Sequence, residues 1–100
     1  MDIFIENKQI GPGYPFYIIA EAADNHLGSM ERAKRMVLEA KKAGADAIKF
    51  QHHLLDEEML PVIPMSDNFK EPLYEFLKKY ALNLAQHKEL KQFCEKIGIQ

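Results

Sequence analysis

Three polar residues lie at or near the ends of two apolar segments, where their side chains could act on a small anionic substrate. Lys49 and Gln51 close residues 45–51, and Glu21 closes residues 17–21. In parallel α/β folds, ligands bind at the carboxyl ends of the strands. We therefore expect a carboxylate, an ammonium and an amide to converge on one pocket.

Lys49 is the most informative of the three, because Phe50 and Gln51 still follow it in the segment. Alternate strand residues share a face, so Lys49 and Gln51 should project together while Ile48 and Phe50 pack against helices. A lysine that points into a sheet interior needs a carboxylate, a substrate anion or a carbonyl with which it forms a Schiff base. The alternative is a structural ion pair between Lys49 and Glu21.

The elements that must position these residues follow a strand–helix–strand pattern. Residues 16–20 are nearly all apolar, as expected for a strand covered on both faces. Ser29 is a suitable N-cap and Gly44 a suitable left-handed terminator, and apolar residues recur every three or four positions between them. This pattern predicts a right-handed βαβ unit.

The flanking segments predict a hairpin before this unit and helices after it. Residues 1–12 contain two short apolar runs around a polar turn, which is typical of a β-hairpin. Residues 54–68 have no regular period and predict an irregular loop with one helical turn at 56–59. Helical spacing returns over 73–80 and again after Asn83, and residues 99–100 resemble the first step of a third strand.

The loop between the first strand and its helix offers two further candidates, Asn25 and His26. Gly28 and Ser29 lead directly into a helix N-terminus, which is a natural site for an anion. Asn25 and His26 could contact such a ligand. The equally good interpretation is a turn-forming asparagine beside a partly exposed histidine.

Two adjacent histidines, His52 and His53, follow the second strand close to several acids. Neighbouring residues on an extended segment point to opposite sides, so this pair is poorly placed to bind one metal ion. We expect them to line the mouth of the site instead. No residue of this chain is predicted as a metal ligand.

Composition excludes several classes of function. The chain has 13 basic and 15 acidic residues with no long run of one sign, so we expect neither nucleic acid nor an anionic membrane as a partner. No apolar stretch approaches ~20 residues and no signal sequence is evident, so a cytoplasmic location is expected. The single cysteine, Cys94, is interpreted as a core residue, and Lys78, Lys79, Lys88 and Lys91 as a solvated helix face.

Taken together, the motifs resemble the N-terminal part of the N-acetylneuraminate (sialic acid) synthase family. The matching residues are Ile18-Ile19-Ala20-Glu21, Asn25-His26-x-Gly28, the run from Ala43 to Gln51, Leu73-Tyr74-Glu75 and the run from His87 to Lys91. Ala22-Ala23-Asp24 departs from the Ile-Gly-Val type of sequence that is more usual after the glutamate. The resemblance covers nearly the whole chain but only about the first third of a typical (β/α)8 barrel member of about 250 residues or more.

The resemblance implies a TIM-barrel transferase that condenses phosphoenolpyruvate with an N-acylated aminosugar. It assigns Lys49 to phosphoenolpyruvate, Gln51 to the open-chain sugar and Glu21 to a hydroxyl or a proton near the reacting groups. Asn68 is the nearest candidate for a sugar-contacting asparagine. The resemblance also implies a divalent metal, Mn²⁺ or Mg²⁺, whose ligands come from later strands of family members, and a homodimer as the full-length enzyme.

We therefore predict that residues 1–100 are the N-terminal part of such a barrel domain, with a hairpin at about 1–12 and βαβα units at about 16–100. Such a segment is expected to be incomplete and inactive alone. Two alternatives stay open. One is a Schiff-base aldolase on a similar barrel with Lys49 as nucleophile, and the other is a non-catalytic βα module that binds a sugar phosphate or a protein partner.

Overall fold

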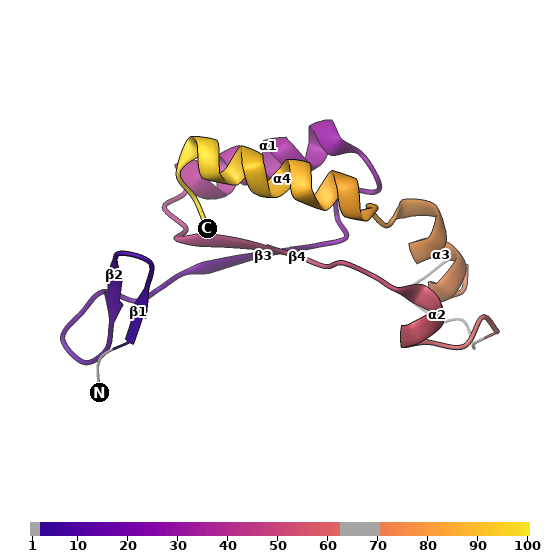
Figure 1. Ribbon diagram of the computed structural model, residues 1–100, viewed down its shortest axis with the longest axis horizontal. Coiled ribbons are helices and arrows are strands. Elements are labelled where there is room, and N and C mark those ends of the chain that lie inside the picture. The colour runs from indigo at the N-terminus through magenta and orange to yellow at the C-terminus, as the bar shows by residue number, and fades with distance from the viewer. Residues whose placement is uncertain (1–2, 63–70) are drawn as a thin grey trace.

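Two parallel strands, covered on one face by two helices, form the centre of the structure (Figure 1). The computed structural model describes residues 3–62 and 71–100. Strand β3 spans Ile19–Ala23 and strand β4 spans Ala47–Phe50, and they pair with Glu21 directly beside Lys49. Helices α1 (Met30–Lys42) and α4 (Leu84–Ile97) lie side by side over the covered face.

Helix α1 forms where the sequence supplies its caps. The Ser29 hydroxyl accepts a hydrogen bond from the Arg32 backbone N–H at 3.1 Å, which satisfies one of the free donors of the first turn. Gly44 has a φ of +93°, the left-handed conformation expected just after the helix. The predicted apolar stripe is confirmed, because Ala33, Val37 and Ala40 are buried.

The core lies between α1, α4 and one face of the sheet. Leu90 and Cys94 of α4 are buried against the α1 stripe, and Ile48 and Phe50 of β4 pack against the same cluster. The prediction that Ile48 and Phe50 face the helices is therefore confirmed. Burial raises the pKa of the Cys94 thiol, as expected for an inert core cysteine.

The first sheet strand begins and ends later than the sequence predicts. We expected it over residues 16–20 with Glu21 at its end, but β3 covers Ile19–Ala23 and Glu21 lies inside it. The reason is the partner, because pairing with β4 starts at Ile19 opposite Ala47 and Phe16 is 91% exposed. A register shift between Glu21 and Ala23 interrupts the ladder, which resumes with Ala23 opposite Phe50 at the end of both strands.

The predicted hairpin is confirmed, with β1 at Ile3–Ile5 and β2 at Lys8–Ile10 in antiparallel register. Lys8 belongs to the second strand and forms an ion pair with Asp46, the residue just before β4. The second Asp46 oxygen accepts the Ile18 backbone N–H at 2.7 Å. This aspartate therefore ties the hairpin to the amino end of the sheet.

Helices α2 (Leu55–Glu58) and α3 (Leu73–Tyr80) lie beyond the carboxyl end of β4 (Figure 1). The Tyr74 hydroxyl of α3 donates a 2.7 Å hydrogen bond to Asp56 of α2. The predicted helical turn within 54–68 is confirmed with a shift of one residue. Residues 63–70 of that segment lie outside the described residues.

The chain returns to the sheet after α4. Gly98 is left-handed, and the Gln100 carbonyl accepts the Ile48 N–H at 2.9 Å while the Gln100 N–H donates to the Asp46 carbonyl at 3.2 Å. These two bonds have the pattern of a parallel ladder with β4. Gln100 thus pairs as the first step of a third strand would.

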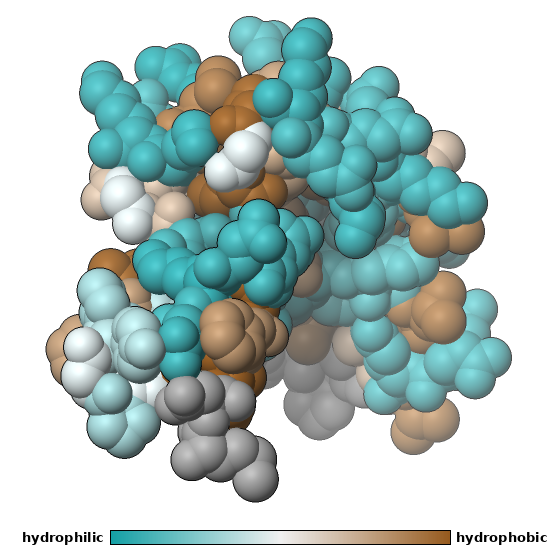
Figure 2. All heavy atoms as spheres, turned by 60° about the vertical axis from the view of Figure 1, so that its left-hand side comes forward, coloured by the Kyte–Doolittle hydropathy of each residue, from teal (hydrophilic) through white to brown (hydrophobic). Residues whose placement is uncertain are grey.

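Hydrophobic residues form separate groups between more numerous hydrophilic ones on the face drawn in Figure 2. Large apolar side chains remain exposed, including Phe16, Ile18 and Ile19. The four outer lysines, Lys78, Lys79, Lys88 and Lys91, are exposed as predicted. Within the described ranges, no helix is both long and apolar enough to cross a bilayer.

Candidate functional site

Glu21 and Lys49 meet on the sheet face opposite α1 and α4. The Lys49 Nζ atom lies 3.7 Å from Glu21 Oε2, and the two side chains are 64% and 52% exposed. An ion pair this exposed contributes under about 1 kcal/mol, so the ammonium is not firmly committed to the carboxylate. The structure thus brings together a cation and an acid that an anionic ligand could reach.

Gln51 follows β4 directly and its side chain is exposed. Its placement one residue past the strand is set by the four-residue pairing of β4 with β3. Asn68 lies outside the described residues, so its predicted sugar contact stays a prediction.

Asn25 stabilises the turn that leaves β3. Its Nδ2 atom donates to the Ala22 carbonyl at 3.0 Å, and its backbone N–H donates to the same oxygen at 3.1 Å. This is the behaviour of a turn-forming asparagine, one of the two interpretations of the sequence. The residue itself remains exposed beside the sheet end.

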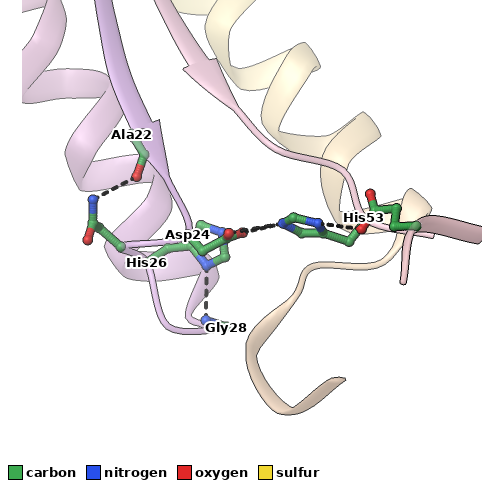
Figure 3. Close-up of polar contacts among 7 residues, drawn as sticks. Ala22, Asp24, His26, Gly28 and His53 are labelled. Carbon is green, nitrogen blue, oxygen red and sulfur yellow. Dashed lines mark hydrogen bonds and ion pairs between the residues drawn. The ribbon is translucent and has the colours of Figure 1, made fainter. Parts of the chain in front are cut away.

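His26 differs from its expected partly exposed position, because its side chain is fully buried. The ring lies 6.1 Å from the Phe50 ring between centroids, and Nδ1 accepts the Gly28 backbone N–H at 2.9 Å (Figure 3). Burial lowers the pKa of His26, so the neutral ring is favoured. His26 therefore shapes the loop from within.

The contacts of His53 at the carboxyl end of the sheet were not predicted from the sequence. Its Nε2 atom lies 3.0 and 3.1 Å from the two Asp24 carboxylate oxygens, and Nδ1 lies 2.9 Å from Glu58 Oε2 (Figure 3). Its side chain is only 10% exposed. A histidine five residues before a glutamate was the available signal in the sequence.

His52 turns to a different neighbour. Its ring centroid lies 4.8 Å from that of His87 on α4, whereas His53 contacts the two carboxylates. Burial lowers the pKa of His87, and the nearby His52 and His26 lower it further. The two adjacent histidines thus have separate partners, and no group of three or more His, Cys, Asp or Glu side chains among the described residues is arranged to hold a metal ion.

A sequence profile described as the NeuB family matches residues 36–100. The chain belongs to the NeuB family. Together with the relatives and the solved structure described next, this match confirms the predicted relationship to sialic acid synthases.

Similar proteins support the assignment. An uncharacterized protein of Methanocaldococcus jannaschii is 40% identical over 97 residues, which cover 97% of this chain and 26% of that protein. The N,N'-diacetyllegionaminic acid synthase of Legionella pneumophila is 33% identical over 99 residues, covering 93% of this chain and 28% of that protein. The chain therefore spans about a quarter of the length of these curated relatives.

The fold also matches a solved structure. The N-acetylneuraminic acid synthetase of Leptospira borgpetersenii, solved with citrate, aligns with a TM-score of 0.75 and 33% identity over 99% of this chain and 32% of that chain. The predicted α/β fold, a hairpin followed by βαβα units of a TIM-barrel enzyme, is confirmed by this likeness. The domain limits within the NeuB chain stay a prediction.

Proposed function

We propose that this NeuB-family protein is a synthase that condenses phosphoenolpyruvate with an N-acylated aminosugar to give a sialic-type acid and phosphate. The observation that carries the proposal is the pairing of Glu21 with Lys49 on the open face of the sheet. Relatives named as legionaminic acid synthase and N-acetylneuraminic acid synthetase support the same reaction class.

Lys49 suits the charge of phosphoenolpyruvate. This substrate carries a phosphate and a carboxylate, and a charge-assisted contact from an ammonium is about twice as strong as a neutral hydrogen bond. Because the 3.7 Å ion pair between Lys49 and Glu21 is weak, a substrate anion can replace Glu21 as the partner of the Lys49 ammonium at little cost in free energy. Release of Glu21 then leaves a carboxylate free to orient a sugar hydroxyl or to move a proton.

The remaining candidates surround this pair. We assign Gln51 to the open-chain sugar, and Asn25, His26 and Asn68 to the substrate-binding region, with buried His26 acting through the loop. In the reaction the enol carbon bonds to the aldehyde carbon, water adds to the adjoining carbon, and phosphate leaves as its C–O bond breaks. One phosphoenolpyruvate, one sugar and one water thus give one acid and one phosphate.

The resemblance implies a divalent cation, which supplies polarisation of the sugar aldehyde when bound. The described residues do not form a site for it, because the ring nitrogens of His53 already face two carboxylates and His52 packs on His87. A cytoplasmic location and a homodimer remain part of the proposal.

Replacing Lys49 tests the proposal. In the full-length enzyme, Lys49→Met should lower kcat/KM for phosphoenolpyruvate by about 10²–10³, the effect of losing one group that stabilises developing charge. Lys88→Met is the matched control, because Lys88 is an exposed lysine on α4. Steady-state phosphate release measures both variants, and circular dichroism checks that both are folded. Equal activities would remove Lys49 from the site.

The aldolase alternative uses the same residue differently. A Schiff-base enzyme would give a stable adduct on Lys49 when treated with pyruvate and borohydride. We expect no adduct, together with phosphate release that depends on the sugar. An adduct on Lys49 without phosphate release would overturn the synthase proposal.

A further inference from the structure

We propose that His53 is a positioning residue, held as an imidazolium between Asp24 and Glu58, that fastens the loop after β3 to helix α2 at the carboxyl end of the sheet. We call this trio of residues the His53 clasp. We further propose that the His53 clasp holds the loop after β3 in place as one wall of the substrate site. This second part rests on the proposed function.

The geometry of His53 requires two donors. Nε2 lies 3.0 and 3.1 Å from the Asp24 oxygens, and Nδ1 lies 2.9 Å from Glu58 Oε2. Ionised carboxylates only accept hydrogen bonds, whereas a neutral imidazole carries a single N–H. A neutral ring would therefore set a lone pair against one carboxylate, and only the imidazolium satisfies both contacts (Figure 3).

The electrostatic surroundings agree with this geometry. Burial opposes the charge, but the hydrogen bonds to Glu58 and Asp24 outweigh it and raise the pKa of His53 above its usual value. The other histidines nearby, His26 and His87, have lowered pKa values because of burial, so they add little opposing charge. A hollow on the α2–α3 side of His53 is lined by further charged or titratable groups, which are Asp56, Glu57, Tyr74 and Lys78.

The clasp reaches the loop through Asp24. The Asp24 carbonyl accepts the Leu27 N–H at 3.1 Å, and His26 next accepts the Gly28 N–H at 2.9 Å. Fixing the Asp24 side chain therefore fixes one end of the turn that contains Asn25. The other end of the clasp, Glu58, is the last residue of α2. Two segments that are far apart in the sequence are thus joined by one side chain.

The sign of the pH dependence follows from the raised pKa. Since His53 binds its proton more tightly in the folded state, the clasp contributes its full stabilisation below the ordinary histidine pKa of about 6.5. That contribution is lost as the pH rises through the raised pKa of His53. We therefore expect the loop to loosen on the alkaline side.

Ring-¹⁵N histidine NMR of the full-length protein tests the charge state. Both His53 nitrogens should be protonated at pH 6, and Asp24→Asn or Glu58→Gln should each lower the titration midpoint by about one pH unit. Glu57→Gln is the matched control, because Glu57 lies on α2 beside Glu58 without contacting His53. A neutral His53 at pH 6, or midpoints unchanged in both test variants, would overturn the clasp.

Amide exchange and kinetics test the positioning. A shift of one pKa unit corresponds to about a tenfold change in an equilibrium, so the Leu27 and Gly28 amides should exchange about tenfold faster in Asp24→Asn than in Glu57→Gln. In an active enzyme, the KM should increase at pH values above the titration midpoint of His53, while kcat changes little. Asp24→Asn should move this increase in KM to lower pH.

The two proposals fail separately. If no phosphate is released from phosphoenolpyruvate but the NMR and exchange results hold, the proposed function is wrong and the clasp stands. If condensation is observed while exchange of the loop is the same in Asp24→Asn and Glu57→Gln, the positioning role is wrong. An active enzyme whose KM is independent of pH across the His53 midpoint would also overturn that role.

Discussion

Gly28 is a single residue on which the shape of the loop after β3 depends. Its φ of +79° lies in the left-handed region, and a Cβ built on it would lie 3.3 Å from the Tyr80 carbonyl oxygen. Two separate costs therefore oppose any side chain there: backbone strain and crowding by the end of α3. The same turn contains Asn25 and is anchored by Asp24, so its shape bears on the candidate site.

We predict that Gly28→Ala destabilises the protein by about 1–2 kcal/mol from strain, with a further cost from the Tyr80 contact. Gly44→Ala is the control for strain alone, because Gly44 has a φ of +93° and nothing within 4 Å of its would-be Cβ. Urea denaturation of both variants measures the difference. Equal losses would show that the loop yields around Tyr80 and that the close approach carries no cost.

The same residues show where sequence reasoning at this scale succeeds. Strand alternation correctly placed Ile48 and Phe50 on the helices, because period two is a property of the backbone. The expectation that residues at the carboxyl ends of parallel strands lie close together correctly brought Glu21 near Lys49. Neither argument could show that His26 is fully buried or that His53 lies between two carboxylates. Those facts depend on how the loop after β3 packs against the segment around His53 and α2, and Asp24 and His53 are 29 positions apart in the sequence.

At the scale of elements, α4 is well specified by local chemistry. Its N-terminus carries a complete capping box, in which the Asn83 side chain accepts the Gln86 N–H and the Gln86 side chain accepts the Asn83 N–H, both at 2.8 Å. The helix supplies Leu90 and Cys94 to the core. Loss of the cap should therefore lower the stability of the whole unit that packs against α4.

We predict that Asn83→Ala lowers the free energy of unfolding by about 1 kcal/mol, the usual cost of removing a side-chain N-cap. Gln86→Ala should cost less, and the double variant should cost less than the sum, since the two bonds are reciprocal. Gln92→Ala, an exposed site in the middle of α4, serves as the control. Strictly additive losses would show that the two halves of the box act independently.

Helix limits were predicted closely because caps and apolar periodicity are local properties of the chain. Strand limits were not, because a strand exists only where a partner pairs with it. Residues 16–18 are apolar enough for a strand, yet the β3 ladder begins at Ile19, opposite the first residue of β4. The hairpin was predicted well for the opposite reason, since its partner strand lies only a turn away in the sequence.

At the scale of the whole molecule, the described elements are spread out. The radius of gyration is 16.2 Å, against about 13 Å for a compact chain of this length. The hairpin lies on one side of the central unit and α2 and α3 lie on the other (Figure 1). Consequently one face of the β3–β4 sheet has no described helix over it.

The open face of the sheet leads to a prediction about how the 100 residues behave when they are expressed alone. Phe16 is 91% exposed and Ile18 and Ile19 are each 55% exposed, and no strand among the described residues pairs with the outer edge of β3. Exposed apolar side chains and a free strand edge favour pairing between copies, with roughly 25 cal/mol gained per Å² of apolar surface buried. We expect association that grows with concentration.

Sedimentation velocity across a wide concentration range measures this association, and Ile19→Lys provides its internal test. A lysine on the edge strand repels a second copy, so it should shift the distribution towards monomer, whereas Gln92→Lys on the outer face of α4 should leave it unchanged. Association of the unmodified chain that Ile19→Lys does not reduce would place the contact elsewhere, on the hairpin or around α2. A chain that stays monomeric throughout would mean that its exposed apolar residues are too dispersed to hold two copies together.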